Sequence, residues 1–389
     1  MDSDEVRSLL ADIEDPALGD DIVSLGLVNE VSVDGDTARV SLGLGAPFAP
    51  DESRIADRVR EALEAEGLAV ELAAGIARET PREDRMLPDV KNIVAVASGK
   101  GGVGKSTVAV NLAAGLADRG ARVGLFDSDI YGPNVPRMLA PEDAPRVTED
   151  RTVPPEKYGV KLISMDFFLD DDDPVVWRGP MVQKTLTQLW EDVVWDTLDY
   201  LVVDLPPGTG DAQLSLLQSL PVTGAVIVTT PQQVAVDDAD KGLRMFDQFD
   251  TPVLGIVENM ASYRCPSCGD EHDILGSGGG ERLARENDVP LLGSIPMDRS
   301  VQMGDDGSPP AVLQPDSAAA DAFDEVVDNA ADRVGAVVRR RHAEVVGAVE
   351  PDADAGSGSG SGPTDAGEPD GTDAGAGDAD PTRTPPGGD

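Results

Sequence analysis

Seven short apolar runs, separated by longer amphipathic segments, recur through the middle of this 389-residue chain. They are Ile93–Ala97, Val123–Phe126, Val160–Ile163, Tyr200–Val203, Ala225–Val228, Val253–Val257 and Leu291–Ile295. Apart from Lys161 and Ser294, the runs are continuously apolar and do not alternate with polar residues, which is typical of strands covered on both faces. The pattern predicts an α/β architecture, a parallel sheet with helices on both faces, whose ligands bind at the carboxyl ends of the strands.

Changes in composition divide the chain into four parts. These are a small domain at 1–80, a polar linker at 81–90, the parallel-sheet domain at 91–348 and an acidic tail at 349–389. The first part holds an acidic helix, two alternating segments at Leu27–Val33 and Ala38–Leu42, and a helical run at Ser53–Glu66, which together predict a small α+β domain. After Pro351 the tail has no aliphatic side chain larger than alanine, so it cannot offset its ordering entropy and is predicted to be disordered.

The formal net charge is −42, and acidic residues run through the body of the chain, as at Asp170–Asp173 and Val236–Asp240. Such a charge repels nucleic acid and anionic membranes over most of the surface, and a salt-rich cytoplasm would screen its self-repulsion. The first residues have no basic segment and no long apolar run, and no stretch reaches the roughly 18 apolar residues of a membrane span. We therefore expect a soluble cytoplasmic protein from a salt-loving organism, with no nucleic-acid or membrane partner.

A glycine-rich segment joins the first apolar run of the sheet domain to a helix predicted at Ser106–Arg119. It reads ASGKGGVGKST from Ala97 to Thr107 and matches the phosphate-binding pattern G-x-x-x-x-G-K-[ST]. Glycines let backbone N–H groups converge on phosphate oxygens, Lys105 reaches the outer phosphates, and the Ser106 hydroxyl is a ligand for Mg²⁺. The predicted nucleotide-binding residues in this loop are Gly99, Lys100, Gly101, Gly102, Val103, Gly104, Lys105, Ser106 and Thr107.

The loop contains a second lysine, Lys100, which is not needed to hold the phosphates. It is either a solvated loop lysine or a group that crosses a dimer interface and neutralises charge on the partner's nucleotide during phosphoryl transfer. Lysine is scarce in this chain, which favours the second interpretation. The pattern K-G-G-x-G-K-[ST] at Lys100–Ser106 resembles the deviant Walker A group of P-loop ATPases, the MinD/ParA class, where the early lysine acts in this way across a nucleotide-sandwich dimer.

Acidic residues follow later strands in the order found in that group. The resemblance implies that Asp129 positions the attacking water, that Asp127 supports the Mg²⁺ shell, and that Asp204 is the Walker B aspartate. Each of these aspartates taken alone could instead cap a helix. Asn259 resembles the asparagine that reads the adenine edge. The predicted catalytic set is Lys100, Lys105, Asp129 and Asp204.

The chain has two cysteines, Cys265 and Cys268. A four-coordinate thiolate site needs four ligands, so one chain supplies half a site and a two-fold dimer would supply the rest. Three uses compete: a zinc clip between subunits, a redox dithiol, and an iron–sulfur cluster shared by two chains. A redox dithiol normally opens a helix after an early strand, whereas these cysteines lie late in the chain.

The combination of motifs resembles the Mrp branch, the iron–sulfur cluster carrier ATPases. The segments that carry this resemblance are Trp177–Pro180, Asp204–Asp211, Thr229–Gln233, Glu258–Met260, Cys265–Gly269 and Gly276–Gly280. In that branch the paired cysteines of two subunits hold a labile [4Fe–4S] cluster that is passed to apo-proteins. The resemblance therefore implies a homodimer that uses ATP and Mg²⁺ and carries such a cluster to client proteins. The alternatives are a MinD/ParA-like positioning ATPase and a zinc-stapled, ATP-dependent switch.

The first part of the chain also has a resemblance. Asp15–Leu18 and Ile22–Val28 are similar to the small iron–sulfur-assembly domain often fused in front of Mrp ATPases. That domain often carries Cys-Pro after its second strand, but here Ala49 stands at the cysteine position before Pro50. We therefore expect this domain to dock partners and not to use a thiol.

Overall fold

The structure is a computed structural model that describes residues 1–78, 86–129, 132–148, 151–168, 192–265, 267–301, 308–315 and 317–350. Three features named above lie outside these residues: the tail from Pro351, the first half of the linker, and the segment that contains Asp170–Asp173 and Trp177–Pro180. Among the described helices, none combines the length and the apolarity that a membrane crossing needs.

The large sheet has nine strands among the described residues, in the order β13-β12-β11-β4-β10-β5-β9-β8, with β14 also paired to β12. Their bounds are β4 (Val90–Ser98), β5 (Val123–Asp127), β8 (Glu156–Lys157), β9 (Val160–Ser164), β10 (Leu198–Asp204), β11 (Gly224–Thr229), β12 (Val253–Arg264), β13 (Glu271–His272) and β14 (Leu291–Met297). The β8–β9 and β12–β13 pairs are antiparallel, and all the other pairs are parallel. Each of the seven apolar runs is one of the parallel strands, so the predicted parallel sheet is confirmed.

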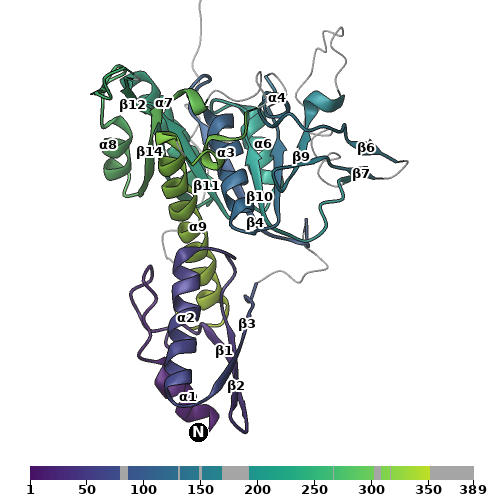
Figure 1. Cartoon of the computed structure of the whole chain (residues 1–389), viewed down its shortest axis with the longest axis vertical. Coiled ribbons are helices and arrows are strands. Elements are labelled where there is room, and N and C mark those ends of the chain that lie inside the picture. Colours follow the sequence, from purple (N-terminus) through teal and green to yellow (C-terminus); the bar gives the residue numbers. More distant parts are fainter. Residues whose placement is uncertain are drawn as a thin grey trace, which may run out of the picture.

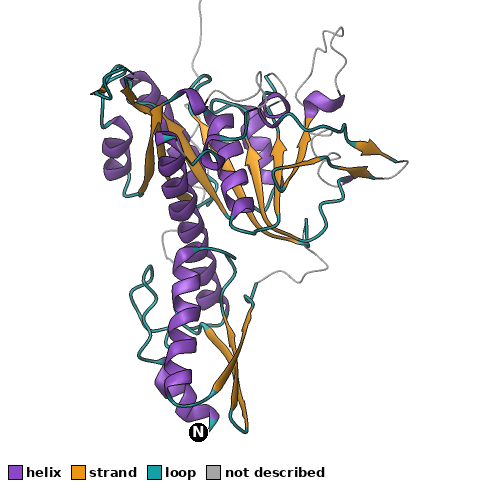
Figure 2. Ribbon diagram, viewed as in Figure 1, coloured by secondary structure: helices purple, strands orange, loops and turns teal. Residues whose placement is uncertain are grey.

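Helices cover both faces of this sheet (Figure 2). One face packs against α3 (Lys105–Asp118), α4 (Val135–Leu139), the short 3₁₀ helix η4 (Ala311–Leu313) and part of α9 (Ala318–Val345), and the other against α6 (Asp211–Ser219), α7 (Gln233–Gln248) and α8 (Gly279–Glu286). The side chains of β4 alternate between the two cores, with Val94 and Val96 on the α3 side and Ile93, Ala95 and Ala97 on the α7 side. Burial on both sides explains why the strand is continuously apolar.

The remaining elements of this part are short. They are a two-stranded hairpin of β6 (Arg146–Val147) and β7 (Thr152–Val153) and the 3₁₀ helices η2 (Met165–Phe168) and η3 (Arg299–Val301).

The small domain contains α1 (Ser3–Leu10), β1 (Val28–Asp34), β2 (Thr37–Leu42), α2 (Pro50–Ala65) and β3 (Ala69–Ala74). The two alternating segments form an antiparallel hairpin, β1 and β2, and β3 adds to β2 as a parallel strand after the crossover through α2. Asp2 and Glu5 form a reciprocal capping box that begins α1. The helices and the hairpin agree with the predicted α+β fold, and β3 is an addition to it.

The long helix α9 belongs to both parts of the molecule. Figure 1 shows it running from the large sheet down alongside α2 in the small domain. In its first half, Asp328 pairs with Arg119 at the end of α3, with 2.8 Å between Oδ1 and Nη2. Near its end, Nδ1 of His342 accepts a hydrogen bond of 2.7 Å from the N–H of Ala77 in the small domain. The helix therefore connects α3, which follows the predicted phosphate-binding loop, to the small domain.

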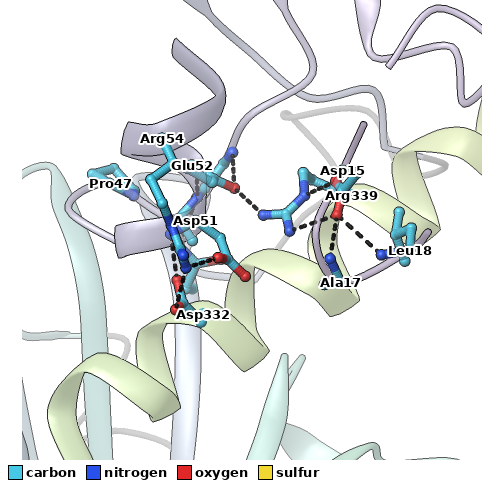
Figure 3. A network of polar contacts seen from close by, with 12 residues as sticks. Asp15, Ala17, Leu18, Pro47, Asp51, Glu52, Arg54, Asp332 and Arg339 are labelled. Carbon is cyan, nitrogen blue, oxygen red and sulfur yellow. Dashed lines mark hydrogen bonds and ion pairs between the residues drawn. The ribbon is translucent and has the colours of Figure 1, made fainter. Parts of the chain in front are cut away.

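A buried ion network fixes α9 to the small domain, as Figure 3 shows. The Arg339 side chain is fully buried, its Nε lies 2.5 Å from Oδ2 of Asp15, and its Nη1 lies 3.4 Å from Oε1 of Glu52. Glu52 also accepts the backbone N–H groups of Gly45 and Ala46 at 3.1 and 2.9 Å. Burial raises the pKa of Glu52, and the guanidinium of Arg339 opposes that rise. The charges inside this joint are therefore paired and hydrogen-bonded.

The loop before α2 is inserted into the large domain. Ala46 and Ala49 are fully buried and belong to the same core as β4 and α3. The carbonyl of Gly45 accepts a 2.8 Å bond from Nδ2 of Asn92, and the carbonyl of Pro47 accepts a 2.8 Å bond from the Tyr200 hydroxyl. Ala49, which the sequence resemblance places at a frequent cysteine position, is thus buried between the two domains.

Candidate functional site

The loop between β4 and α3 turns through two residues with positive φ, Gly102 at +82° and Gly104 at +88°. L side chains rarely adopt this conformation, so both positions favour glycine. A Cβ at Gly101 or Gly102 would meet nothing within 4 Å, whereas a Cβ at Gly99 would come within 2.2 Å of the backbone of Asp238 in α7. The loop therefore rests on α7 at one end and borders open space beside the N-terminus of α3, where a phosphate group is attracted.

Lys105, Ser106 and Asp204 meet at the carboxyl edge of the sheet. Lys105 Nζ lies 2.5 Å from Asp204 Oδ1, and Ser106 Oγ donates a 2.5 Å hydrogen bond to Asp204 Oδ2. Asp204 is fully buried, and this burial raises the pKa of its carboxyl, while Lys105 and Ser106 oppose the rise. A carboxylate next to a hydroxyl supplies the hard oxygen ligands that Mg²⁺ prefers.

Asp127 lies directly beside this cluster, at the end of β5, and its partner in the register of the neighbouring strand β10 is Asp204. Its Oδ2 accepts a 3.0 Å hydrogen bond from the Ser164 hydroxyl. Burial, followed by the charge of Asp204, raises the pKa of Asp127 to about 7, and Lys105 works in the opposite direction. Two acidic groups and one lysine thus share one buried space.

The other predicted residues of the loop region lie around this cluster. Asp129 is 8% exposed, and its Oδ1 accepts a 3.2 Å bond from the N–H of Gly132. The side chain of Lys100 is partly exposed and forms no ion pair with any residue in the described parts of the chain. Thr107 lies in the first turn of α3 and is also partly exposed.

Asn259 contacts the phosphate-binding loop. It lies within β12 and is 3% exposed. Its Nδ2 donates a 2.8 Å hydrogen bond to the carbonyl oxygen of Val103. The structure thus brings Asn259 to the backbone of the loop, and its predicted contact with adenine stays a prediction.

The two cysteines lie in a tight turn directly after β12. The N–H of Cys265 donates to the carbonyl of Asp270 at 2.9 Å, and the N–H of Gly269 donates back to the carbonyl of Cys265 at 2.8 Å. Backbone hydrogen bonds from Cys268 and then Ser267, followed by the Cys268 side chain, lower the pKa of the Cys265 thiol. Cys268 is exposed, and its Sγ lies 3.3 Å from Oδ2 of Asp270. The described residues contain no group of three or more His, Cys, Asp or Glu side chains placed to hold a metal ion.

The sequence analysis gave no role to three supporting residues. Ser164 holds Asp127, and Ser128 donates its hydroxyl to the carbonyl of Asp204 at 2.7 Å. Glu258, 4% exposed, accepts a 2.8 Å bond from the N–H at Gly280, at the start of α8. Each is a polar residue within two positions of the end of an apolar run. That position in the sequence could have identified all three as candidates for the site.

All of these groups lie at one edge of the sheet. The phosphate-binding loop follows β4, Asp127 ends β5, Asp204 ends β10, and the cysteine turn follows β12. Because these strands are parallel, their carboxyl ends point the same way, as the arrowheads in Figure 2 show. This is the edge where open parallel sheets bind their ligands.

Comparisons with known proteins agree with this arrangement. The model of the NUBPL iron-transfer P-loop NTPase family matches residues 89–331, and that of an iron-sulfur cluster assembly protein matches residues 3–72. An iron-sulfur cluster carrier protein of Synechocystis is 44% identical over 86% of this chain and 98% of its own length, and one of Deinococcus radiodurans is 46% identical over 85% and 95%.

A solved structure of a nucleotide-binding protein from Archaeoglobus fulgidus in complex with ADP is 34% identical, covers 64% of this chain and 91% of its own, and has a TM-score of 0.50. The matched family model covers the loop, the aspartates and both cysteines. The chain therefore belongs to the NUBPL iron-transfer P-loop NTPase family.

Proposed function

We propose that this protein binds and hydrolyses ATP and carries an iron–sulfur cluster that it delivers to apo-proteins. Family membership and the names of its relatives support this function. The observation that carries it is that the Lys105–Asp204 pair and the two thiols follow parallel strands of one sheet and share its carboxyl edge. A nucleotide and a cluster bound there would lie close enough for one to influence the other.

The nucleotide site would use the loop Gly99–Thr107 for the phosphates. Lys105 would move from Asp204 to the outer phosphates, since both are anionic partners within reach of the same ammonium group. The oxygen atoms of Ser106, Asp127 and Asp204 fit Mg²⁺, which when bound would neutralise charge on the phosphates.

Two residues would complete the hydrolytic site. Asp129 would orient the attacking water, because its carboxylate lies in the loop directly after Asp127. Lys100, partly exposed and without an ion pair in the described residues, fits a role on the partner's nucleotide in a dimer.

The cluster would be held between two copies of the chain. Cys265 and Cys268 are the only cysteines of the sequence, and a [4Fe–4S] cluster held by thiolates needs four. The lowered pKa of Cys265 favours the thiolate, which is the form that ligates iron. A homodimer with facing cysteine turns supplies the set, and apo-proteins that need such a cluster are the clients.

The place of action that we propose is the cytoplasm of a salt-rich cell. A net charge of −42 is tolerated where concentrated ions screen it, and it disfavours contact with nucleic acid or anionic lipid.

The deciding experiment is anaerobic reconstitution with iron and sulfide, followed by visible absorption, metal analysis and mass measurement in solution. We expect about four iron and four sulfide per two chains in the wild type, and none in the Cys265→Ala/Cys268→Ala variant. Lys105→Ala should load a cluster but lose the effect of Mg-ATP on its transfer.

Purified protein that holds zinc and takes up no iron would replace this proposal with a zinc-stapled switch. Binding to lipid vesicles or DNA only with ATP would favour a positioning ATPase.

A further inference from the structure

β12 is a physical link between the two proposed sites. Asn259, in the middle of this strand, contacts the phosphate-binding loop, and Cys265 directly follows the last residue of the strand, Arg264. At about 3.3 Å per residue, the thiol turn begins within about 20 Å of the loop along one continuous backbone.

The contact between Asn259 and the loop is close and buried. Its Nδ2 donates to the carbonyl of Val103 at 2.8 Å. A Cβ on the next residue, Gly104, would stand 2.0 Å from the same Nδ2, so the amide fills the space that a side chain at that position would need. A movement of Val103 or Gly104 therefore displaces the Asn259 side chain.

The strand is irregular directly after Asn259. Along β14, Asn259 pairs with Ile295 and Tyr263 with Met297, so four steps on β12 oppose two on β14. Met260, inside this bulge, has a φ of +57°, which is rare for a residue with a side chain. Its N–H donates a 2.9 Å hydrogen bond to Oδ1 of Asn259. The side-chain amide of Asn259 therefore joins the phosphate-binding loop to the bulge, because its nitrogen bonds to Val103 and its oxygen to Met260.

The thiols lie on the far side of the bulge. There Tyr263 and Arg264 pair with His272 and Glu271 of β13, and the cysteine turn closes this hairpin. Bulges bend a strand and increase its twist, so the geometry of the bulge sets the direction of the hairpin.

We propose that Asn259 is a positioning residue that couples the occupancy of the phosphate-binding loop to the conformation of the Cys265/Cys268 turn. A phosphate that draws the backbone N–H groups of the loop toward it shifts the Val103 carbonyl, and the amide carries that shift into the bulge and the hairpin. This inference rests on the nucleotide site of the proposed function but not on cluster binding. A nucleotide can change the conformation of the cysteine turn only if the loop makes different contacts in its free and nucleotide-bound states.

The test uses the cluster-free full chain and measures how fast its thiols react with iodoacetamide, with and without saturating Mg-ADP or Mg-ATP. The chain has two cysteines, so the reaction reports only on this turn. The main variant is Asn259→Asp, which keeps the shape and the acceptor for Met260 but replaces the donor to Val103. Its matched control is Asn329→Asp, because Asn329 Nδ2 donates to the carbonyl of Leu292 at the same 2.8 Å but joins α9 to β14.

We expect nucleotide to change the wild-type alkylation rate about fivefold or more, the range of ordinary coupling between sites. Asn329→Asp should keep that ratio, and Asn259→Asp should bring it close to one at nucleotide concentrations where direct binding measurements give full occupancy. Asn259→Ser, too short to reach Val103 and free of added charge, should behave like Asn259→Asp.

Three results would overturn the inference. Nucleotide could leave the alkylation rate of the wild-type thiols unchanged, or an Asn259 variant with bound nucleotide could keep the full wild-type ratio of alkylation rates. The third result is that Asn259→Asp and Asn259→Ser both lose nucleotide binding. The last result would make Asn259 part of the nucleotide site and not a link from it. The cluster-carrying function is judged separately by iron and sulfide content, so the two proposals fail by different measurements.

Discussion

At the scale of single residues, the environment of Asp127 differs strongly from water. It is fully buried, faces Asp204, and has a pKa raised to about 7 from its usual 3.8. The unfolded chain therefore releases this proton at lower pH than the folded chain does. Between pH 3.8 and about 7, the contribution of Asp127 to the free energy of unfolding falls as the pH rises.

We predict that Asp127→Asn stabilises the magnesium-free protein more at pH 8 than at pH 5. The amide has no charge to bury, so its advantage over the wild type should grow by on the order of 2 kcal/mol between these pH values. The measurement is urea unfolding in the presence of a chelator. Asp34→Asn, at a side chain 81% exposed, is the control and should shift neither curve. An advantage of equal size at both pH values would contradict the raised pKa.

His342 gives the opposite dependence at the domain joint. Its Nδ1 accepts the N–H of Ala77, and its Nε2 lies 3.1 Å from the carbonyl of Gly26, which a neutral ring protonated at Nε2 satisfies. Burial lowers the pKa of His342 below its usual 6.5. The unfolded chain then takes up a proton first, and stability is lost as the pH falls below about 6.5.

We therefore expect wild type to exceed His342→Gln in free energy of unfolding by less at pH 5.5 than at pH 7.5. The measurement is urea unfolding at both pH values. His272→Gln, at an exposed histidine, should show the same difference from wild type at both pH values. A His342→Gln difference that is constant with pH would mean that the buried ring does not stay neutral.

At the scale of elements, α9 is held by Arg339, and the two carboxylates around it are buried as well. Removing one member of a buried ion group leaves the others without compensation, which costs about 3–5 kcal/mol. Arg339→Met should lower the free energy of unfolding by that amount. Arg244→Ala, which breaks an exposed pair with Asp240, should change it by less than about 1 kcal/mol. Similar losses in the two variants would show that the network contributes no more than a surface pair.

The sequence predicted elements better than it predicted their connections. The seven parallel strands followed from their continuous apolarity, and Lys105 and Asp204 from motifs tied to strand ends. β3 was missed because its alanine-rich sequence is largely exposed and its pairing with β2 depends on the crossover through α2. Arg339 and Asp15 are 324 positions apart, and only the folded chain brings them together.

At the scale of the whole molecule, the two domains share one interior. Ala46 and Ala49 complete the core around α3, and α9 completes the small domain. The predicted boundaries at 80 and 348 stay predictions, but the contacts of α9 with Asp15 and Ala77 cross the first of them. The small domain is thus built as a fixed extension of the ATPase, which agrees with the absence of a thiol at Ala49.

This shared interior predicts that the polar linker, predicted at 81–90, is not what holds the domains together. A protease site placed there and cleaved should leave the two fragments associated through size-exclusion chromatography at micromolar concentration. The buried contacts of Arg339, Tyr200 and Asn92 with the small domain, together with the alanines in the core, supply that association. Arg339→Met in the cleaved protein should weaken it, since the charges of Asp15 and Glu52 would be left unpaired. Two fragments that separate at once, each still folded by circular dichroism, would make the small domain a tethered module and not an extension of the ATPase.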